Sequence, residues 1–224
     1  MAPDGNLKQR IADGGPVNVA WGSLDMDRAE LEDMLAEEDF DLTFVDVQHN
    51  PLDENLLVRF WETADELGAP VLLRIAHPRQ AYMCGRYLDM GPLAIVVPMV
   101  ETEEIAREAV EAFYYPPLGR RSWWPAHAYG HEEDQEQRKY ADWWNETGIL
   151  MLQIESVDSV LNAPRLAVSG VDILTFGTAD MRLDIESYDD PPFTSFGEAR
   201  DAVLELTRGM DIRVAASELP VGRL

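Results

Sequence analysis

The chain has 224 residues, 46% of them hydrophobic and 27% charged, a composition typical of a globular protein and a length that favours one domain over residues 1–224. No apolar run approaches the ~18 residues of a membrane-spanning helix, and the single cysteine, Cys84, excludes an internal disulfide and a cysteine-based metal cluster within the chain. The 42 acidic and 18 basic residues give a net charge of -24, which disfavours nucleic acid as a partner because such a surface repels phosphate.

Two further features concern the environment of the protein. Residues 1–15 are polar and contain no apolar core, so no secretory signal is recognisable and we expect a cytoplasmic protein. Apart from Lys8 and Lys139, the residues counted as basic are all arginine. Together with the acidic surface, this pattern fits adaptation to high salt and fits an ordinary acidic cytosolic protein equally well.

Short apolar runs alternate with amphipathic stretches along the chain, a pattern typical of βα units and a parallel sheet. The predicted strands are 17–21, 42–47, 70–75, 94–100, 149–155, 172–177 and 212–217. The predicted helices are 28–38, 54–67, 79–90, 103–113 and 198–208. The expected fold is therefore α/β, a (β/α)8 barrel of the TIM type. Seven strands are recognisable where such a barrel needs eight, so either the last βα unit is absent or exchanged, or a strand assignment is wrong.

The segment 114–147 is too long for a simple loop and contains several prolines and tryptophans. Long insertions on a barrel commonly serve as lids, binding loops or subunit contacts. The alternative is a helical excursion whose tryptophans pack on the barrel. The tryptophans are Trp123, Trp124, Trp143 and Trp144.

Ionisable residues stand where several predicted strands end, which is where barrel enzymes place their reactive groups. Glu155 and Asp180 follow two neighbouring strands, and a buried carboxylate needs a partner. Two carboxylates completed by water and substrate oxygens form a site that suits Mg²⁺ or Mn²⁺. The alternative is that Glu155 pairs directly with Arg74 across the barrel.

His49 lies three residues after Asp46, at the exit of an apolar strand. The carboxylate is expected to hold the imidazole in one tautomer while the other nitrogen transfers a proton. The alternative is a histidine that is hydrogen-bonded for structural reasons alone. Arg74 ends a strand with a planar fork that suits a substrate carboxylate or a neighbouring acid.

The positions of the two lysines disfavour a Schiff-base mechanism. Schiff-base aldolases on this fold need a lysine at the end of a barrel strand, whereas Lys8 lies in the N-terminal tail and Lys139 in the long insertion. If the protein makes or breaks carbon–carbon bonds, we therefore expect a metal to stabilise an enolate.

Motifs spread over most of the chain resemble those of one family, the HpcH/HpaI aldolases, also described as 2,4-dihydroxyhept-2-ene-1,7-dioic acid or 4-hydroxy-2-oxoheptanedioate aldolases. The matching residues are Asp46-Val47-Gln48-His49, Arg74, Leu88-Asp89-Met90-Gly91, Val97-Pro98-Met99-Val100, the YPPLGRRS run from Tyr115 to Ser122, Gln153-Ile154-Glu155, Gly170-Val171-Asp172 and Gly177-Thr178-Ala179-Asp180-Met181. Departures from the family pattern are the missing proline near Asp180, the bulky Trp123 and Trp124, and the unrecognised last strand.

The resemblance implies a divalent metal (Mg²⁺, Mn²⁺ or Co²⁺) held by Glu155 and Asp180, with pyruvate or its enolate bound to it. Arg74 would stabilise the keto oxygen, and His49, oriented by Asp46, would be the base. Gln153 and the backbone amides near Thr178 and Ala179 would seat the pyruvyl carboxylate. It also implies a homo-oligomer, a trimer or hexamer, in which Asp89 approaches a neighbouring site.

Three functions follow as hypotheses. The first is reversible aldol cleavage of a 4-hydroxy-2-oxo acid to pyruvate and an aldehyde, with neither nucleic acid nor membrane as partner. The second keeps the metal and the enolate and changes the electrophile, as in an oxaloacetate decarboxylase, a macrophomate-synthase-like enzyme or a citrate-lyase-type enzyme. The third is a degenerate, non-catalytic barrel.

Overall fold

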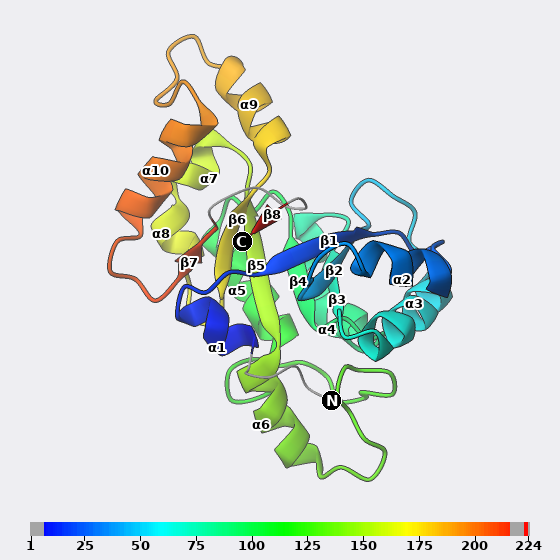
Figure 1. Cartoon of the computed structure of the whole chain (residues 1–224). Coiled ribbons are helices and arrows are strands. Elements are labelled where there is room, and N and C mark those ends of the chain that lie inside the picture. Colours follow the sequence, from blue (N-terminus) through cyan, green and yellow to red (C-terminus); the bar gives the residue numbers. More distant parts are fainter. Residues whose placement is uncertain (1–6, 216–221, 224) are drawn as a thin grey trace.

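The computed structural model describes residues 7–215 and 222–223, and its strands form one sheet in the middle of the molecule (Figure 1). The strands are β1 Asn18–Gly22, β2 Leu42–Asp46, β3 Val71–Arg74, β4 Ala94–Val97, β5 Ile149–Ile154, β6 Ile173–Phe176, β7 Arg213–Val214 and β8 Gly222–Arg223. Every residue of β2 to β6 is buried, as their continuous apolar sequences predict for a parallel sheet covered by helices.

The strand order is β7-β6-β5-β4-β3-β2-β1-β8. Each adjacent pair from β1 to β7 is parallel. The remaining pair, β1 and β8, is antiparallel. The seven parallel strands curl into a half-barrel. The predicted α/β class is confirmed. A closed (β/α)8 barrel is not, because β7 and β8 are the two edges of the sheet in the part of the chain that is described.

Helices flank the sheet, with α2, α3 and α4 to one side in Figure 1 and α7, α8 and α10 to the other. The helices are α1 Leu7–Ala12, α2 Arg28–Leu35, α3 Glu54–Glu66, the 3-10 helix η1 Pro78–Met83, α4 Cys84–Leu88, α5 Glu103–Phe113, α6 Gln137–Thr147, α7 Val157–Leu161, α8 Ala163–Leu166, α9 Thr178–Glu186 and α10 Phe196–Leu206. Among the described residues, no helix is long and apolar enough to cross a membrane.

The sequence explains where several helices begin and which face they bury. Thr102 caps α5, whose buried residues Ala106, Ala109, Val110 and Phe113 recur at helical spacing and form one apolar face. In α2, the capping box of Asp27 and Glu30 fixes the first turn. Gly68 follows α3 with a φ of +82°, the left-handed conformation that ends many helices.

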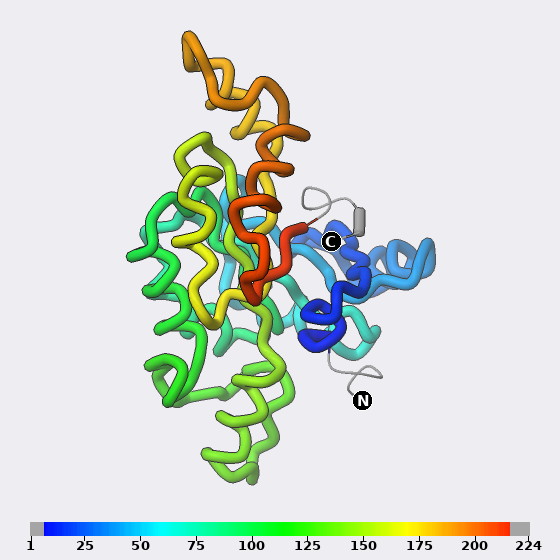
Figure 2. The backbone as a smooth tube through the Cα atoms, turned by 90° about the vertical axis from the view of Figure 1, so that its left-hand side faces the viewer, coloured from blue at the N-terminus to red at the C-terminus, as the bar shows by residue number. Residues whose placement is uncertain are grey.

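The segment 114–147 lies at the end of the sheet where the parallel strands begin. Helix α6 leads directly into β5, and Figures 1 and 2 both show it projecting away from the end that carries α9. Trp144 is fully buried, Trp143 stacks on Tyr129, and Trp124 is exposed. Within one chain the segment is therefore the helical excursion and not a lid over the strand ends.

Lys8 lies in α1 at that same end of the sheet. Its Nζ is 3.2 Å from Asp172 Oδ1, and it donates to the Tyr114 hydroxyl at 2.7 Å and to the Gly148 carbonyl at 2.8 Å. The sequence predicts only that Lys8 belongs to an N-terminal tail. Lys8 instead ties α1 to the beginnings of β5 and β6, remote from the strand ends where a Schiff-base lysine would stand.

Candidate active site

The predicted site residues of β2, β3 and β5 meet at the carboxyl ends of these strands. Asp46 is the last residue of β2 and is in register with Arg74, the last residue of β3. Gln153 is in β5, and Glu155 follows that strand directly. All four are buried, with exposed fractions of 5% for Asp46, 9% for Arg74, 1% for Gln153 and 3% for Glu155.

Asp46, Arg74 and Gln153 form one hydrogen-bonded network. Arg74 donates to both oxygens of Asp46, from Nε to Oδ1 at 2.8 Å and from Nη2 to Oδ2 at 2.7 Å. Its Nη1 donates to Gln153 Oε1 at 3.3 Å, and Gln153 Nε2 donates to the Phe176 carbonyl at 3.3 Å. The two parallel hydrogen bonds to Asp46 fix the plane of the guanidinium, and its remaining N–H groups can donate to a substrate.

The pKa of Asp46 lies below its ordinary value. Burial raises it, but the hydrogen bonds and charge of Arg74, the Gln48 amide and the charge of His49 together more than offset burial. Asp46 is therefore an anion that holds Arg74 in place. The expectation that Asp46 orients His49 is not what its hydrogen bonds show, since both carboxylate oxygens face Arg74 and the His49 side chain is exposed.

Glu155 has an incompletely satisfied carboxylate. Its Oε2 accepts a hydrogen bond from the Met99 amide at 2.7 Å, whereas the buried Oε1 has no hydrogen-bond partner among the described residues. Burial raises the pKa of Glu155 to about 7, opposed by the Met99 amide and the charge of Arg74 and reinforced by the charges of Asp180 and Asp46. The direct Glu155–Arg74 hydrogen bond considered as an alternative is not formed, since Arg74 bonds Asp46 and Gln153.

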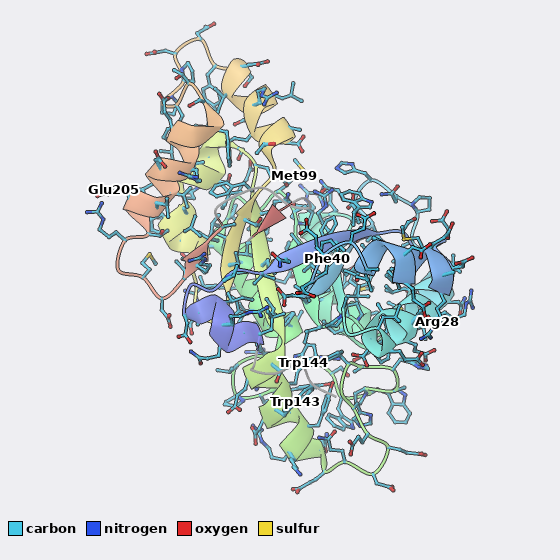
Figure 3. The ribbon with its side chains drawn as sticks, in the orientation of Figure 1. Arg28, Phe40, Met99, Trp143, Trp144 and Glu205 are labelled. Carbon is cyan, nitrogen blue, oxygen red and sulfur yellow. The ribbon has the colours of Figure 1, made fainter. Side chains whose placement is uncertain are left out.

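The sequence motif that contains Met99 does not indicate that its backbone amide donates a hydrogen bond to Glu155. Met99 follows β4, and its φ of 48° is unusual for a residue with a side chain. This conformation turns its amide toward Glu155 and leaves the side chain 45% exposed. Figure 3 shows Met99 at the end of the sheet opposite Trp143 and Trp144. Strained residues of this kind cluster at functional sites, but sequence periodicity does not reveal them.

Thr178, Ala179 and Asp180 form the first turn of α9, which starts directly after β6 and Gly177. Asp180 is half-buried, and its charge contributes to the raised pKa of Glu155. Glu155 follows β5 and Asp180 follows the neighbouring strand β6. The start of a helix favours negative charge, because its first amides point outward along the axis. Glu155, Asp180 and the first turn of α9 therefore all lie at the carboxyl ends of β5 and β6.

The oxygen donors of Glu155 and Asp180 fit a divalent metal. A buried carboxylate oxygen without a partner, beside a second carboxylate, fits a hard cation that takes oxygen ligands. Among the described residues, no group of three or more His, Cys, Asp or Glu side chains could form a protein-only metal site. Two protein carboxylates would leave the remaining positions to water and substrate.

A cavity of about 580 Å³ opens at the carboxyl ends of β1 and β2. The strands contribute Trp21, Gly22, Val45 and Asp46 to its wall, and the loops 23–25 and 50–53 complete it with Leu56 of α3. Cys84 is not a candidate reactive group, because its thiol is buried and burial raises its pKa to about 12.

Comparison with known proteins gives a consistent family. The family model HpcH/HpaI aldolase/citrate lyase matches residues 24–218. A 2-dehydro-3,6-dideoxy-6-sulfogluconate aldolase from Pseudomonas putida is 33% identical over 146 residues, which are 63% of this chain and 55% of that protein. A hydroxypyruvate/pyruvate aldolase from Agrobacterium fabrum is 29% identical over 185 residues, which are 82% of this chain and 68% of that protein. The chain thus spans little more than half the length of the first of these relatives.

A solved structure supports the fold independently. The HpcH/HpaI aldolase from Desulfitobacterium hafniense superposes with a TM-score of 0.78 at 24% identity, covering 93% of this chain and 80% of that one. At this identity the likeness concerns the fold alone. It shows that the curled parallel sheet described above is the arrangement that this solved aldolase also adopts.

Proposed function

Because this chain belongs to the HpcH/HpaI aldolase/citrate lyase family, we propose that it is a divalent-metal-dependent carbon–carbon lyase that interconverts a 4-hydroxy-2-oxo acid with pyruvate and an aldehyde. The observation that carries this proposal is Glu155, a buried carboxylate with one oxygen lacking a described hydrogen-bond partner, close to Asp180 and Arg74. The names of the two aldolase relatives support the same class of reaction.

Glu155 and Asp180 would hold the metal, and the oxygen chemistry of this pair suits Mg²⁺, Mn²⁺ or Co²⁺. When bound, the cation supplies Lewis-acid charge that stabilises the enolate of pyruvate. The Met99 amide holds one oxygen of Glu155 in a fixed direction, so that the other is free to act as a ligand.

Arg74 is the group that binds the developing negative charge on the keto oxygen. Asp46 and Gln153 fix the guanidinium before substrate arrives, so little reorganisation is needed during the reaction. The first amides of α9, those of Thr178 and Ala179, would receive the pyruvyl carboxylate because the start of a helix favours an anion.

His49 is the proposed acid and base. It stands on the exposed loop after β2, near the cavity, and can exchange protons with solvent. In the synthetic direction, C3 of pyruvate gives a proton to His49 and bonds to the aldehyde carbon, and the aldehyde oxygen takes up a proton from His49 to become a hydroxyl. The histidine would move the proton to and from that hydroxyl.

The test is release of pyruvate from a 4-hydroxy-2-oxo acid by the purified protein with added Mg²⁺, Mn²⁺ or Co²⁺. We expect Glu155→Gln to abolish release, and Glu132→Gln, an exposed acid in the remote segment 114–147, to leave it unchanged. Full activity in a chelator would contradict metal dependence. Release of carbon dioxide from oxaloacetate without cleavage of any hydroxy-oxo acid would favour the decarboxylase instead.

We also propose that the protein is a homo-oligomer, a trimer or hexamer. The open edges of the sheet and large apolar side chains that are exposed, such as Leu183 and Trp124, support this proposal. Light scattering at micromolar concentration measures the mass in solution, and a monomer would contradict it.

A further inference from the structure

The cavity at the carboxyl ends of β1 and β2 lies beside the proposed pyruvate site. Asp46 lines the cavity and is bonded to Arg74. The ring of Trp21, another lining residue, packs on Phe44 with centroids 5.3 Å apart, and Arg74 Cζ lies 5.6 Å from the same Phe44 ring. An aldehyde that meets an enolate bound at Arg74 would therefore occupy this cavity.

The ionisable groups that line the cavity are all acidic, namely Asp25, Asp46 and Asp53. Arg74 offsets the charge of Asp46. Asp25 accepts a hydrogen bond from the neutral hydroxyl of Ser23, and Asp53 accepts two from amides at the start of α3. Among the described residues neither carboxylate is part of an ion pair, so this part of the lining holds acidic groups and no basic one.

The arginines near this cavity do not make the charge of its lining positive. Arg28 and Arg59 line a second cavity, of about 280 Å³ between α2 and α3, which shares Asp25 with the first. Arg28 is paired with Glu32 and Glu66. Arg59 is exposed on α3 and is not among the lining residues of the first cavity.

We propose that the acceptor is an uncharged hydroxyaldehyde and that Asp25 and Asp53 select against aldehydes that carry a carboxylate. This inference rests on the proposed function. The carboxylates offer oxygens to the hydroxyl groups of such a substrate, whereas a second anion beside them is repelled. Trp21, Leu24 and Pro51 provide apolar wall for its carbon chain, and the volume is that of an ordinary small-molecule site.

The experiment compares two aldehydes of nearly equal shape and different charge. Succinic semialdehyde carries a carboxylate, and its methyl ester does not. We expect a kcat/KM for condensation with pyruvate at least about tenfold higher for the ester, because the two carboxylates of the cavity wall repel a third and do not repel a neutral ester. Glyceraldehyde, a neutral hydroxyaldehyde, is expected to react at least as well as the ester.

Two variants test whether Asp25 and Asp53 cause the preference for the ester over the acid. Asp25→Asn combined with Asp53→Asn is expected to reduce the ester-to-acid ratio at least about fivefold. Asparagine still caps a helix, so α3 retains its N-cap in the variant. Asp134→Asn removes an exposed charge in the remote segment 114–147 and should leave the ratio unchanged.

Exchange of the pyruvate C3 protons in D2O, followed by NMR, separates failure of this inference from failure of the proposed function, because exchange needs the enolate and no aldehyde. Exchange together with equal use of acid and ester, or with a ratio unaffected by the double variant, would overturn the acceptor inference alone. Absence of exchange with every added metal would overturn the proposed function and this inference with it.

Discussion

Gly177 leaves room for the Glu155 carboxylate. A Cβ atom added to Gly177 would lie 1.8 Å from Glu155 Oε1 and 2.7 Å from its Cδ. These atoms belong to a side chain, so alanine is expected to displace the carboxylate and spare the fold. We predict that Gly177→Ala lowers kcat for pyruvate release by about 100-fold, the order expected for a small misplacement of a catalytic group, while the circular dichroism spectrum stays unchanged.

The matched control is Gly197→Ala in α10. The nearest atom to an added Cβ there is Ser195 Oγ at 3.9 Å, so nothing has to move. This variant should keep full activity and gain slightly in stability, because alanine favours a helix. A Gly177→Ala enzyme with the kcat of the wild type would show that the position of Glu155 does not limit the reaction.

The charge on Glu155 makes stability depend on pH when no metal is bound. The pKa of this group is about 7 in the folded protein against an ordinary value of 4.5. Below 4.5 both states bind the proton, and stability is unaffected. As pH rises through the folded pKa, the folded state must accept an unfavourable buried charge, so stability is lost. The shift corresponds to at most about 3 kcal/mol.

Urea unfolding in a chelator at pH 5 and pH 8 measures this effect. Glutamine at position 155 cannot ionise, so Glu155→Gln should be more stable than the wild type at pH 8, and this advantage should nearly vanish at pH 5. An advantage that is equal at both values would mean that Glu155 titrates normally in the folded chain.

At the residue scale, the positions of the site residues could be predicted but their pairings could not. Asp46, Arg74, Gln153 and Glu155 were found because polar groups at the ends of buried strands are readable in a sequence. That Arg74 rather than His49 bonds Asp46 depends on the lateral register of β2 and β3. A single sequence contains no direct signal for that register.

At the scale of elements, one buried ion pair joins α4 to the segment 114–147. Arg121, whose side chain is fully buried, donates from Nη2 to Asp89 Oδ1 at 2.6 Å. Its guanidinium lies 4.8 Å from the Tyr115 ring centroid and 4.7 Å from that of Trp144. We predict that Asp89→Asn lowers the free energy of unfolding by about 3 kcal/mol, because it leaves a buried cation without its anion.

Chemical denaturation measures this loss, and an exposed pair gives the control. Asp142→Asn removes the partner of Arg138 on the surface of α6 and should leave the free energy of unfolding almost unchanged. Arg121→Met combined with Asp89→Asn should recover part of the loss, because the unpaired charge is gone. A single Asp89→Asn variant as stable as the wild type would contradict the prediction.

The elements themselves were predicted best where burial is continuous. All of β1 to β6 and the helices α2, α3, α5 and α10 lie within a few residues of the predicted ranges. The predicted helix 79–90 is divided into η1 and α4. Helices α1, α7 and α8 were missed because four to six residues are too few to show a helical period. Helix α9 was missed although it is longer than α2, because its apolar residues are not gathered on one face: Met181 and Ile185 are buried but Leu183 is exposed. Of the predicted strand 212–217, residues 213 and 214 are extended, and 216 and 217 lie outside the described residues.

At the scale of the whole molecule, the alternation of strands and helices was enough to predict the α/β class and a parallel sheet. It was not enough to predict closure. The described strand β8, Gly222–Arg223, is two residues long and has no apolar pattern that a sequence could reveal, and it runs antiparallel to β1.

The net charge of -24 should make stability depend strongly on salt. Screening weakens repulsion among the acidic groups and also weakens exposed ion pairs such as Arg28–Glu32 and Arg107–Glu103. Such pairs contribute little to stability, whereas the repulsion involves the whole surface. We therefore predict that raising KCl from about 0.1 M to about 1 M raises Tm by at least about 3 °C, the change that about 1 kcal/mol produces in a domain of this size.

Calorimetry at several KCl concentrations tests this balance, and a variant with less charge identifies its cause. Glu132→Gln, Glu133→Gln and Asp134→Asn together remove three exposed charges from one stretch of the segment 114–147. If repulsion is the cause, this triple variant should have a higher Tm than the wild type at low salt and a smaller increase on adding KCl. Because apolar burial is also strengthened by some salts, KCl and sodium sulfate must be compared at equal ionic strength. A Tm indifferent to KCl would exclude adaptation to high salt and leave the acidic cytosolic protein as the explanation.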